Sequence, residues 1–305
     1  MRHSAAKSID MQKTGFLAIV GRPNVGKSTL LNALLGEKVA IVSKKPQTTR
    51  TRITGILTEG ENQFVFLDTP GMHSPKTRLG SVMVKAVSTA LADVDAAILV
   101  ADASRAPGDV EKQLIRRFEQ DGTPAILVLN KTDLSNAVKV GEVITAYAEL
   151  FDFASVVPIC ALKEDGVSIV KAEAAKLLHE GEWIFDEDAL TDQPERAIAG
   201  EMIREKILRL MDNEIPHGTA VVIEEFKEEG KMIRIRAEIF CEREAHKRML
   251  IGNGGAMLKK IGSYAREDME KFFGVKVFLD LWVKVKENWR DSDFIIRDFG
   301  FKNQD

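Results

Sequence analysis

The sequence predicts a doubly wound α/β domain with a mostly parallel sheet, followed by a smaller α+β domain. Three observations support this fold class. The chain has 305 residues, about twice a common domain length. Up to residue 178 short apolar runs alternate with helical patterns, and beyond residue 196 the order of the elements changes. The predicted boundaries are a loose tail at 1–13, a first domain at 14–178, a linker at 179–196 and a second domain at 197–305.

Five apolar runs are predicted as strands of the first domain. The last four are continuously apolar, as a parallel sheet with helices on both faces requires. The runs lie at 16–20, 63–69, 96–103, 125–131 and 155–161. A further strand is expected at TRITGIL (51–57), and helices are expected from Ser28 onward, at 111–120 and at 139–151.

The linker and the second domain differ from this pattern in composition and in order. The linker is acidic, contains a proline and has no periodicity, which is typical of a connection between domains. After it come a helix, two alternating strands, two helices separated by the sequence IGNGG, and a long closing strand. These elements are expected at 201–211, 219–226, 232–240, on either side of 251–255, and at 275–286.

The composition excludes several classes of protein. Hydrophobic residues make up 45% and charged residues 29%, which is ordinary for a soluble globular chain. The net charge is −3, so nucleic-acid binding must depend on a local basic patch. Cys160 and Cys241 lie far apart and are expected to be free thiols in a reducing cytosol. No run approaches the roughly 18 apolar residues of a membrane span, and the N-terminus lacks a signal core, so a cytoplasmic location is expected.

Residues 21–28, GRPNVGKS, match the phosphate-binding loop G-x-x-x-x-G-K-[ST] and lie between a predicted strand and a predicted helix. The glycines let backbone N–H groups turn inward around a phosphate, at the start of a helix whose dipole favours negative charge. Lys27 is expected to contact the outer phosphates, and the Ser28 hydroxyl is expected to bind Mg²⁺. The loop alone fits ATPases, kinases and GTPases alike.

The base-reading element favours guanine. The sequence NKTD (130–133) follows a predicted strand, and the carboxylate of Asp133 can accept hydrogen bonds from both N1–H and the N2 amine of guanine. Adenine lacks this pair of donors, so an ATP-dependent enzyme would leave Asp133 desolvated and unpaired. Lys131 can cover the base with its aliphatic stem, and Asn130 can tie this loop to the phosphate loop. A backbone N–H of CAL (160–162) is placed to reach guanine O6.

A second loop, DTPG, begins at Asp68 and also ends a predicted strand. Asp68 is expected to hold Mg²⁺ through water, and the Gly71 N–H is expected to sense the γ-phosphate, so the loop moves when that phosphate leaves. In the basic loop 44–52, a threonine hydroxyl would complete the Mg²⁺ shell; Thr49 is preferred and Thr48 is the alternative. The predicted Mg²⁺ residues are Ser28, Thr49 and Asp68. The predicted nucleotide contacts are Gly21, Arg22, Pro23, Asn24, Val25, Gly26, Lys27, Ser28, Thr29, Asp68, Thr69, Pro70, Gly71, Met72, Asn130, Lys131, Thr132, Asp133, Cys160, Ala161 and Leu162.

As a set, the sequences GRPNVGKSTLLNALLG, KPQTTRTRITGI, FLDTPGMH and NKTD resemble the Era family of bacterial ribosome-assembly GTPases. The likeness runs from Phe16 to Phe301, and LWVKVKENW near the C-terminus is similar to the closing strand of the family. Most GTPases lack a second domain of this kind, so the motifs are specific as a set. The resemblance implies that the first domain is a P-loop G domain and that the second is a KH domain of type II topology.

KH domains clamp single-stranded RNA between a G-x-x-G loop and the adjoining strand. Here GNGG (252–255) joins two predicted helices, which is the required place. The family usually has a basic residue within this loop and this chain has Gly254, so phosphate contact is expected to shift to nearby lysines or backbone N–H groups. Trp282 and Trp289 are candidates for stacking on bases, although the alternation of its strand favours core packing for Trp282. The predicted RNA contacts are Lys247, Arg248, Gly252, Asn253, Gly254, Gly255, Lys259 and Lys260.

The resemblance also implies a function, namely a GTP-hydrolysing switch that binds the 3′ end of 16S ribosomal RNA and acts in assembly of the small ribosomal subunit. It implies a monomer that does not bind DNA, with a peripheral inner-membrane fraction beside the cytoplasmic one. The alternative is a signalling GTPase at the membrane or on a protein partner, with the second domain as an adaptor.

Hydrolysis is expected to depend on Lys27 and Gly71, and no residue stands out as a catalytic base. In Ras-like enzymes a glutamine after D-x-x-G orients the attacking water. Here that position is Met72, which cannot hydrogen-bond water, so slow intrinsic turnover is predicted. Asn24 stands where related GTPases use an asparagine to hold potassium, so K⁺ is a hypothetical addition to the cofactors GTP/GDP and Mg²⁺.

Overall fold

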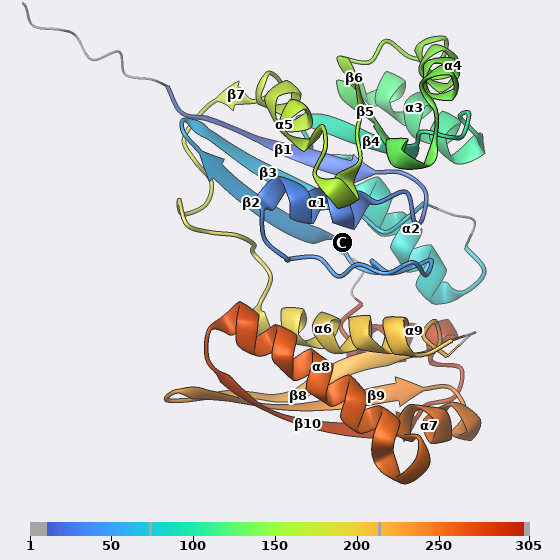
Figure 1. Cartoon of the computed structure of the whole chain (residues 1–305), viewed down its shortest axis with the longest axis vertical. Coiled ribbons are helices and arrows are strands. Elements are labelled where there is room, and N and C mark those ends of the chain that lie inside the picture. The colour runs from blue at the N-terminus through green and yellow to red at the C-terminus, as the bar shows by residue number, and fades with distance from the viewer. Residues whose placement is uncertain (1–10, 73–74, 213–214, 302–305) are drawn as a thin grey trace, which may run out of the picture.

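The computed structural model describes residues 11–72, 75–212 and 215–301 and folds them into two layered units stacked one above the other (Figure 1). The first unit contains β1 (Lys13–Val20), α1 (Lys27–Leu35), β2 (Ile53–Glu59), β3 (Asn62–Asp68), α2 (Arg78–Ala90), β4 (Ala96–Asp102), α3 (Asp109–Asp121), β5 (Ala125–Asn130), α4 (Ala137–Ala148), β6 (Ser155–Pro158), α5 (Val167–Ala175) and β7 (His179–Glu180). The second contains α6 (Glu195–Leu210), β8 (Ala220–Glu229), β9 (Met232–Cys241), α7 (Glu244–Ile251), α8 (Ala256–Phe273), β10 (Lys276–Val285) and α9 (Asp293–Asp298).

The sheet of the first unit has the strand order β2-β3-β1-β4-β5-β6, and β7 pairs with β1. Strands β3, β1, β4, β5 and β6 run parallel to one another, whereas β2 is antiparallel to β3 and β7 is antiparallel to β1. Successive side chains of a strand point to opposite faces, and those of β1 enter two separate cores. Leu17 and Ile19 pack in the core that contains α1, while Ala18 and Val20 pack in the core that contains α3. This is the predicted doubly wound α/β sheet, covered on both faces.

Helices α2 and α5 were not expected from the sequence. Helix α2 has the sequence RLGSVMVKAVSTA, in which glycine, serine, threonine and valine weaken the intrinsic helical preference. It forms because Leu79, Met83 and Val87, spaced by four residues, are all buried against other elements.

The chain between the two units lies along the first sheet. Gln63 donates from Nε2 to the Phe185 carbonyl over 2.8 Å, and the Thr191 hydroxyl donates to the Thr54 carbonyl over 2.6 Å. Together with β7, these bonds attach the region predicted as a linker to β1, β2 and β3. Helix α6 then begins at Glu195, six residues before its predicted start.

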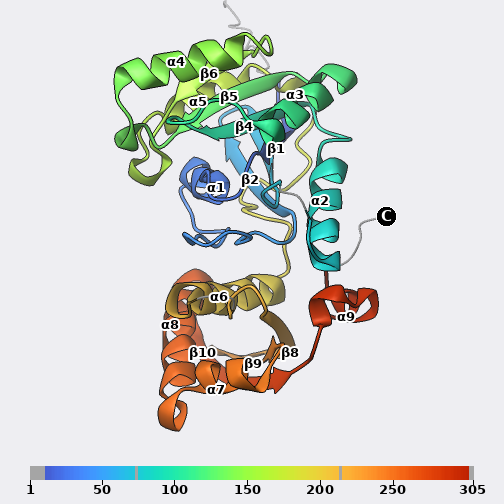
Figure 2. The ribbon, with the colours of Figure 1, turned by 90° about the vertical axis from the view of Figure 1, so that its right-hand side faces the viewer.

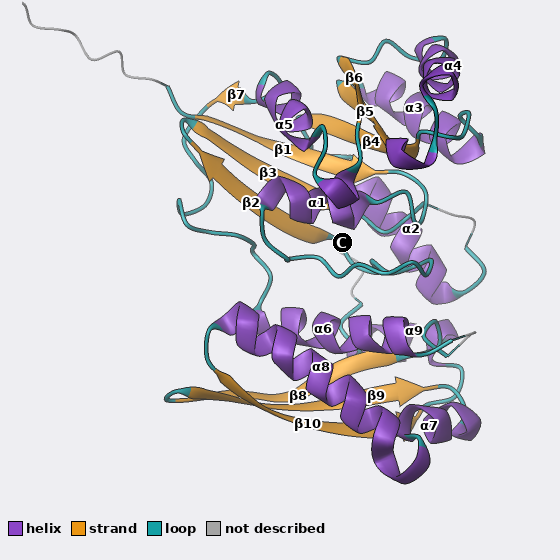
Figure 3. Cartoon of the chain, in the orientation of Figure 1, coloured by secondary structure: helices purple, strands orange, loops and turns teal. Residues whose placement is uncertain are grey.

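The second unit has the element order α-β-β-α-α-β and one three-stranded sheet, β10-β9-β8. Strands β8 and β9 are antiparallel and β9 and β10 are parallel. Helices α6 and α8 cover one face of this sheet (Figure 3), with Ile203, Ile235 and Ile261 at the centre of the shared core. Both cysteines are buried free thiols, as predicted.

The C-terminal segment returns to the first unit. Trp289, in a short 3₁₀ turn, and Phe301, beyond α9, pack with Leu79 and Met83 of α2 in a separate core. Figure 2 shows α9 beside the lower end of α2. Among the described residues, none of the helices combines the length and the apolar character needed to cross a membrane.

Candidate nucleotide site and nucleic-acid interface

The phosphate loop connects β1 to α1 and is shaped by its two glycines. Gly21 and Gly26 have φ values of 146° and 102°, which side chains rarely adopt. A Cβ at Gly21 would lie 2.3 Å from the Val100 carbonyl oxygen, and one at Gly26 would lie 2.2 Å from Asn130 Nδ2. Both positions therefore require glycine, because strand β4 and Asn130 approach the loop backbone closely.

Lys27 is held beneath this loop. Its Nζ donates to the carbonyls of Gly21, over 3.1 Å, and Arg22, over 2.8 Å, and the residue is only 6% exposed. Burial lowers the Lys27 pKa to about 8, against the opposing effect of the Asp68 carboxylate. A buried cation bound mainly to carbonyls is stabilised when an anion approaches, so the loop is suited to phosphate.

The three residues predicted to bind Mg²⁺ lie together. The Ser28 hydroxyl donates to Asp68 Oδ2 over 2.6 Å and lies 2.8 Å from the Thr49 hydroxyl, which is itself 3.4 Å from Asp68 Oδ2. The alternative, Thr48, points elsewhere: its hydroxyl donates to the Lys45 carbonyl over 2.7 Å and lies 2.8 Å from the Ser43 hydroxyl. The structure thus brings Thr49, and not Thr48, to Ser28 and Asp68.

This arrangement fits a magnesium ion. Asp68 is fully buried and burial raises its pKa to about 6, although Lys27 and the hydroxyls of Ser28 and Thr49 oppose the rise. Its Oδ1 is buried without a hydrogen-bond partner, so this oxygen is available to accept a further hydrogen bond. No cluster of three or more His, Cys, Asp or Glu side chains occurs in the described part of the chain. A site with one carboxylate and two hydroxyls suits Mg²⁺, which keeps several waters and binds substrate phosphates.

Asn130 connects the loop at 130–133 to the phosphate loop, as predicted. Its Nδ2 donates to the Val25 carbonyl over 2.8 Å, and its Oδ1 accepts from the Ala161 N–H over 2.9 Å. The neighbouring Cys160 N–H donates to the Asp165 carbonyl over 3.0 Å. Because both N–H groups have acceptors here, the contact of this turn with guanine O6 stays a prediction.

Asp133 lies at the rim of this site with a side chain that is 24% exposed. One carboxylate oxygen accepts from the Cys160 thiol over 3.2 Å, and the other lies 3.8 Å from Lys163 Nζ. Lys131 is fixed beside it, since its backbone is left-handed (φ 67°) and its Nζ lies 3.1 Å from Asp102 Oδ2. The carboxylate is therefore accessible but held in place, as a group that reads two donors of a base must be.

The loop after Asp68 packs against the phosphate loop. A Cβ at Gly71 would lie 2.6 Å from the Pro23 backbone, and the Met72 N–H donates to the Gly21 carbonyl over 3.1 Å. The Met72 side chain packs against the apolar core on the α3 face of the sheet. The structure describes this loop only in part, because residues 73–74 of the predicted mobile segment lie outside the described residues.

In the second unit, a groove of about 480 Å³ lies between α8 and β10. Gly252, Gly254 and Gly255 form the turn at one end of it, with φ values of 73°, 58° and 84°. Of the predicted RNA contacts, Gly255 and Lys259 line the groove. Lys247 and Arg248 lie on α7, Asn253 is exposed on the turn, and Lys260 lies 5.9 Å from the Tyr264 ring. Arg266 and Phe278 also line the groove.

The expectations for the two tryptophans were wrong. Trp282, expected in the core, is 58% exposed, because its side chain points to the sheet face that α6 and α8 leave open. Trp289, a candidate for stacking on bases, is completely buried, and its Nε1 donates to the Gly218 carbonyl over 3.0 Å. Trp289 packs with Phe301 and with α2, and α2 is about two hundred positions away in sequence, so no local pattern could have indicated its burial.

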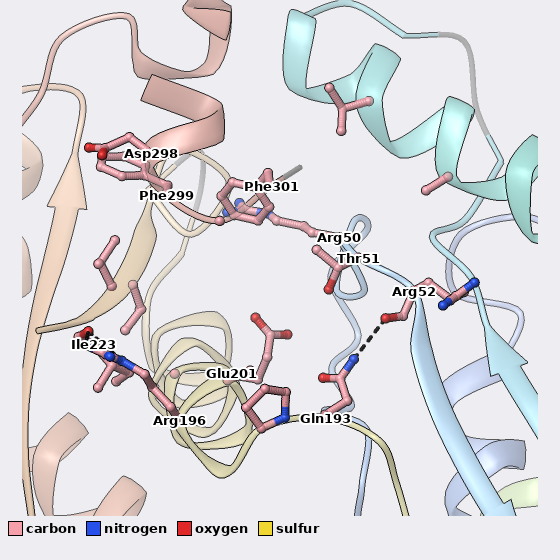
Figure 4. Close-up of a pocket in the computed structure, with 18 of the residues that line it drawn as sticks. Arg50, Thr51, Arg52, Gln193, Arg196, Glu201, Ile223, Asp298, Phe299 and Phe301 are labelled. Atoms are coloured by element: carbon pink, nitrogen blue, oxygen red, sulfur yellow. Dashed lines mark hydrogen bonds between the residues drawn. The ribbon is translucent and has the colours of Figure 1, made fainter. Parts of the chain in front are cut away.

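Arg50 joins the two units. It follows Thr49, yet its guanidinium enters the second unit and donates to the carbonyls of Thr219, over 2.6 Å, and His217, over 2.9 Å. It is 2% exposed and lies 5.7 Å from the centroid of the Trp289 ring. Beside it, a cavity of about 530 Å³ opens between α2, α6, β8 and the C-terminal segment (Figure 4).

Helix α6 forms hydrogen bonds with the same loop, which contains Val42, Thr48 and Thr49. Arg204, which is 1% exposed, donates to the Thr48 carbonyl, and Glu205 Oε1 accepts from the Val42 N–H over 3.1 Å. Lys38 Nζ lies 2.7 Å from Glu205 and 2.8 Å from Asp268 on α8. The loop that carries Thr49 is thus bound on one side to the phosphate loop and on the other to the second unit.

Comparisons with known proteins match both units of the chain. Residues 16–131 match the family model described as 50S ribosome-binding GTPase, and residues 214–290 match the KH domain model. GTPase Era of Ruminiclostridium cellulolyticum is 48% identical over 291 residues, which cover 95% of this chain and 98% of that protein. GTPase Era of Clostridium kluyveri is 46% identical over 293 residues, which cover 96% of this chain and the whole of that protein.

Two solved structures match over almost the same length, each with a TM-score of 0.91, 39% identity, and coverage of 95% of this chain and 99% of the other. One is a variant of Aquifex aeolicus Era bound to GDP and AlF4⁻. The other is Era in complex with MgGDPNP and nucleotides 1506–1542 of 16S ribosomal RNA. The chain therefore belongs to the Era family of GTPases: it is a GTP-hydrolysing enzyme in which a P-loop G domain, with GTP/GDP and Mg²⁺ as its cofactors, is followed by a KH domain.

Proposed function

We propose that this GTPase binds the 3′ end of 16S ribosomal RNA through its KH domain and acts in assembly of the small ribosomal subunit. The observation that supports this most directly is the Era complex with MgGDPNP and nucleotides 1506–1542 of 16S RNA, whose fold is shared over 95% of this chain. The groove beside the glycine turn, with Lys259 and Arg266 on its wall, is suited to a single strand and its phosphates.

The test is the binding of a labelled RNA that copies nucleotides 1506–1542, measured by fluorescence anisotropy against a scrambled RNA of the same length. The double variant Asn253→Asp/Gly254→Asp places two carboxylates on the exposed turn, where they repel phosphates. A Cβ at Gly254 meets no atom within 4 Å, and aspartate tolerates its left-handed backbone better than most residues. Preference for the true sequence, lost in the double variant, is expected; equal weak binding to both RNAs would contradict the proposal.

The geometry supports the following roles at the nucleotide. Residues 21–29 surround the phosphates, with Lys27 giving up its carbonyl partners for phosphate oxygens. Ser28 and Thr49 hold Mg²⁺ by their hydroxyls and Asp68 holds it through water; the ion, when bound, neutralises charge on the phosphates. Residues 130–133, with the turn at 160–162, read guanine.

Hydrolysis requires a positioned water and donors for the charge that develops on the transferring phosphoryl group. Lys27 and the Gly71 N–H supply such donors in our proposal. Met72 is committed to the apolar core and cannot orient water, which supports a slow intrinsic rate. Asn24 has a left-handed backbone (φ 63°), and its Nδ2 donates to the Lys44 carbonyl over 3.0 Å. An amide and a carbonyl brought together in this way could supply oxygen ligands to K⁺.

We further propose that GTP controls RNA binding through Arg50. Thr49 depends on the γ-phosphate and Mg²⁺, and its neighbour Arg50 is anchored in the KH domain next to Trp289. Trp289 also packs with Leu79 and Met83 of α2, the helix that follows the Asp68 loop. Both nucleotide-sensing loops thus reach the same buried ring. GTP can shift the equilibrium between two arrangements of the domains only if it binds one arrangement more tightly than the other. Each of the two loops has a contact with the nucleotide site that can differ between the arrangements.

The remaining proposals concern organisation and location. We propose a G domain at 14–178, a linker at 179–196 and a KH domain at 197–305, in a monomer that does not bind DNA. A role on the ribosomal subunit implies the cytoplasm, and a peripheral inner-membrane fraction stays a prediction. Cell fractionation with a salt wash distinguishes the two locations.

A further inference from the structure

The cavity of about 530 Å³ beside Arg50 has walls from both domains (Figure 4). Its volume lies in the range of pockets that hold small ligands. One wall is the face of α2 that carries Val82 and Ala86, spaced by one helical turn. The other walls include the first turns of α6 and the start of β8, with Val221 and Ile223. An occupant of this cavity would therefore contact the G domain and the KH domain together.

The apolar walls of the cavity are already formed. Gly200 lies within α6, where glycine is an unfavourable helix residue, and it leaves space beside Ile223. A Cβ at Gly200 would lie 3.6 Å from the Ile223 side chain, which is an ordinary contact. Phe299 and Phe301 also line the cavity, and their ring centroids lie 5.5 and 6.1 Å from that of Trp289, which fixes them in place. These walls suit a ring or a short aliphatic chain.

The charged side chains on the walls are mostly cations. Of the described residues, four cations and two carboxylates line the cavity: Arg50, Arg52, Lys85 and Arg196, and Glu201 and Asp298. Glu201 is already neutralised, because the Arg204 guanidinium donates to both of its oxygens, over 2.8 and 2.6 Å. Asp298 is exposed at the end of α9, where water weakens the effect of its charge. The remaining charge favours an anionic ligand.

Arg50 is a buried cation without a carboxylate partner. It is 2% exposed, its guanidinium donates to the carbonyls of Thr219 and His217, and it forms no ion pair in the described part of the chain. Its Nε is buried with no hydrogen-bond partner. Burial, and then the neighbouring charge of Arg204, lower the Arg50 pKa to about 9. A negative charge in the cavity beside it would stabilise this guanidinium.

The start of α6 provides a second region of positive charge. Arg196 donates to the carbonyls of Ile223, over 3.0 Å, and Glu224, over 2.9 Å, and it pairs with no carboxylate among the residues that the structure describes. The N-cap residue of α6, Pro194, lines the cavity and provides no side-chain acceptor for the first turn. Glu195, the acidic residue of that turn, does not line the cavity. Because a helix N-terminus attracts anions, Arg196 and this turn together suit a negatively charged group.

We propose that the cavity between the domains binds a small amphiphilic anion, namely a ring or short aliphatic chain that carries a carboxylate, sulfonate or phosphate group. Its apolar part lies against Ala86, Val221 and Phe299, and its charged group lies toward Arg196 and the first turn of α6. Because such a ligand contacts both domains, it stabilises this arrangement of them. The inference goes beyond the proposed RNA-binding function and does not depend on it, since no residue lines both this cavity and the groove between α8 and β10.

The test uses the full chain saturated with Mg²⁺ and GDP, so that the phosphate loop is filled. The probe is naphthyl phosphate, and its binding is measured by isothermal titration calorimetry. Naphthol, which lacks the charge, and inorganic phosphate, which lacks the rings, are titrated beside it. Arg196→Gln removes a cation of the cavity, and Ala86→Leu fills the cavity from α2. The matched controls are Arg116→Gln on α3 and Ala172→Leu on α5, which replace exposed helical residues outside the cavity.

We expect naphthyl phosphate to bind the wild type about tenfold more tightly than either naphthol or phosphate. Arg196→Gln and Ala86→Leu should each weaken the probe by a similar factor, and the two controls should match the wild type. The probe should also raise the thermal denaturation midpoint of the wild type and leave that of Ala86→Leu unchanged. The inference is overturned if the probe does not bind, if either cavity variant binds it as tightly as the wild type, or if naphthol or phosphate binds equally well. RNA affinity enters none of these measurements, so failure of the proposed function would leave them intact.

Discussion

The guanidinium of Arg50 lies 5.7 Å from the centroid of the Trp289 ring, although the two residues belong to different domains and are separated by more than two hundred positions. Arg50 follows the threonine that approaches Ser28 and Asp68, and Trp289 packs with the helix that follows the Asp68 loop. This buried contact is one route by which the nucleotide site can influence the KH domain, in agreement with the proposed control of RNA binding.

Replacing Arg50 should uncouple the domains. In Arg50→Lys the charge remains, but the fork that reaches the carbonyls of Thr219 and His217 is lost. We expect RNA affinity to become nearly the same with GDP and with a non-hydrolysable GTP analogue, where the wild type differs by about 5- to 150-fold. Nucleotide affinity should change little, since Arg50 does not line the phosphate pocket.

The control for this variant is Arg52→Ala. Arg52 lines the same cavity as Arg50, and in the described part of the chain its guanidinium has no hydrogen-bond partner. It should retain the nucleotide dependence of RNA binding. Loss of that dependence in Arg52→Ala, or its survival in Arg50→Lys, would contradict the assigned route.

Magnesium binding should weaken at acid pH. Burial raises the Asp68 pKa to about 6, and only the ionised carboxylate can accept from a metal-bound water. We expect Mg²⁺ affinity to be constant above about pH 7 and to fall about tenfold per unit well below pH 6. The measurement is a titration of the nucleotide-bound protein with Mg²⁺ across this pH range. Asp68→Asn is the control, because it should show no pH dependence of Mg²⁺ affinity.

The raised pKa of Asp68 favours folding at low pH, whereas it weakens Mg²⁺ binding there. The folded-state pKa of Asp68 lies above its ordinary value of 3.8, so the protonated form favours the folded protein. This contribution is present at low pH and is lost as the pH rises through about 6. Chemical denaturation of the metal-free protein should show a smaller difference between wild type and Asp68→Asn at pH 4.5 than at pH 7; a constant difference would argue against the raised pKa.

Guanine recognition should depend on Asp133. In Asp133→Asn the acceptor for two guanine donors is replaced by an amide that offers a donor of its own. Hydrogen bonds to charged groups contribute about 1.5–3 kcal/mol each, so GTP affinity should fall roughly 100-fold or more. Competition against a fluorescent GDP measures it. Lys163→Ala, which removes only the partly exposed cation 3.8 Å away, should change affinity little; an unchanged Asp133→Asn would remove the guanine assignment.

Potassium should accelerate hydrolysis. The Asn24 amide and the Lys44 carbonyl lie together above the phosphate loop, where a monovalent cation can neutralise developing charge in place of a side chain. Turnover should be faster in KCl than in NaCl at equal ionic strength, and Asn24→Ala should lose the difference while keeping its affinity for GDP. Equal rates in both salts for the wild type would count against a potassium site.

Local chemistry made the nucleotide site predictable. A phosphate loop needs glycine at Gly21 and Gly26 wherever it occurs, and the link from Asn130 to this loop followed from the position of NKTD at a strand end. The fold class followed from the alternation of apolar runs. These features are decided by residues close together in sequence, or by the requirement that a buried strand be apolar on both faces.

The features that join the domains were not predictable in this way. Helix α2 has weak intrinsic helical preference and depends on contacts with residues more than two hundred positions later. The same contacts bury Trp289. Trp282 was expected to be buried and is exposed. The alternation in β10 indicated that one face of the strand is buried, but it did not indicate which face the helices cover.

The central claim is that GTP sets the affinity of the KH domain for RNA. The most direct measurement is the dissociation constant of the RNA copying nucleotides 1506–1542, determined by anisotropy for the wild-type protein saturated first with GDP and then with a non-hydrolysable GTP analogue, both with Mg²⁺. The account predicts tighter binding in the analogue state. Identical dissociation constants in the two states would contradict it and would leave a GTPase whose RNA site does not respond to its nucleotide.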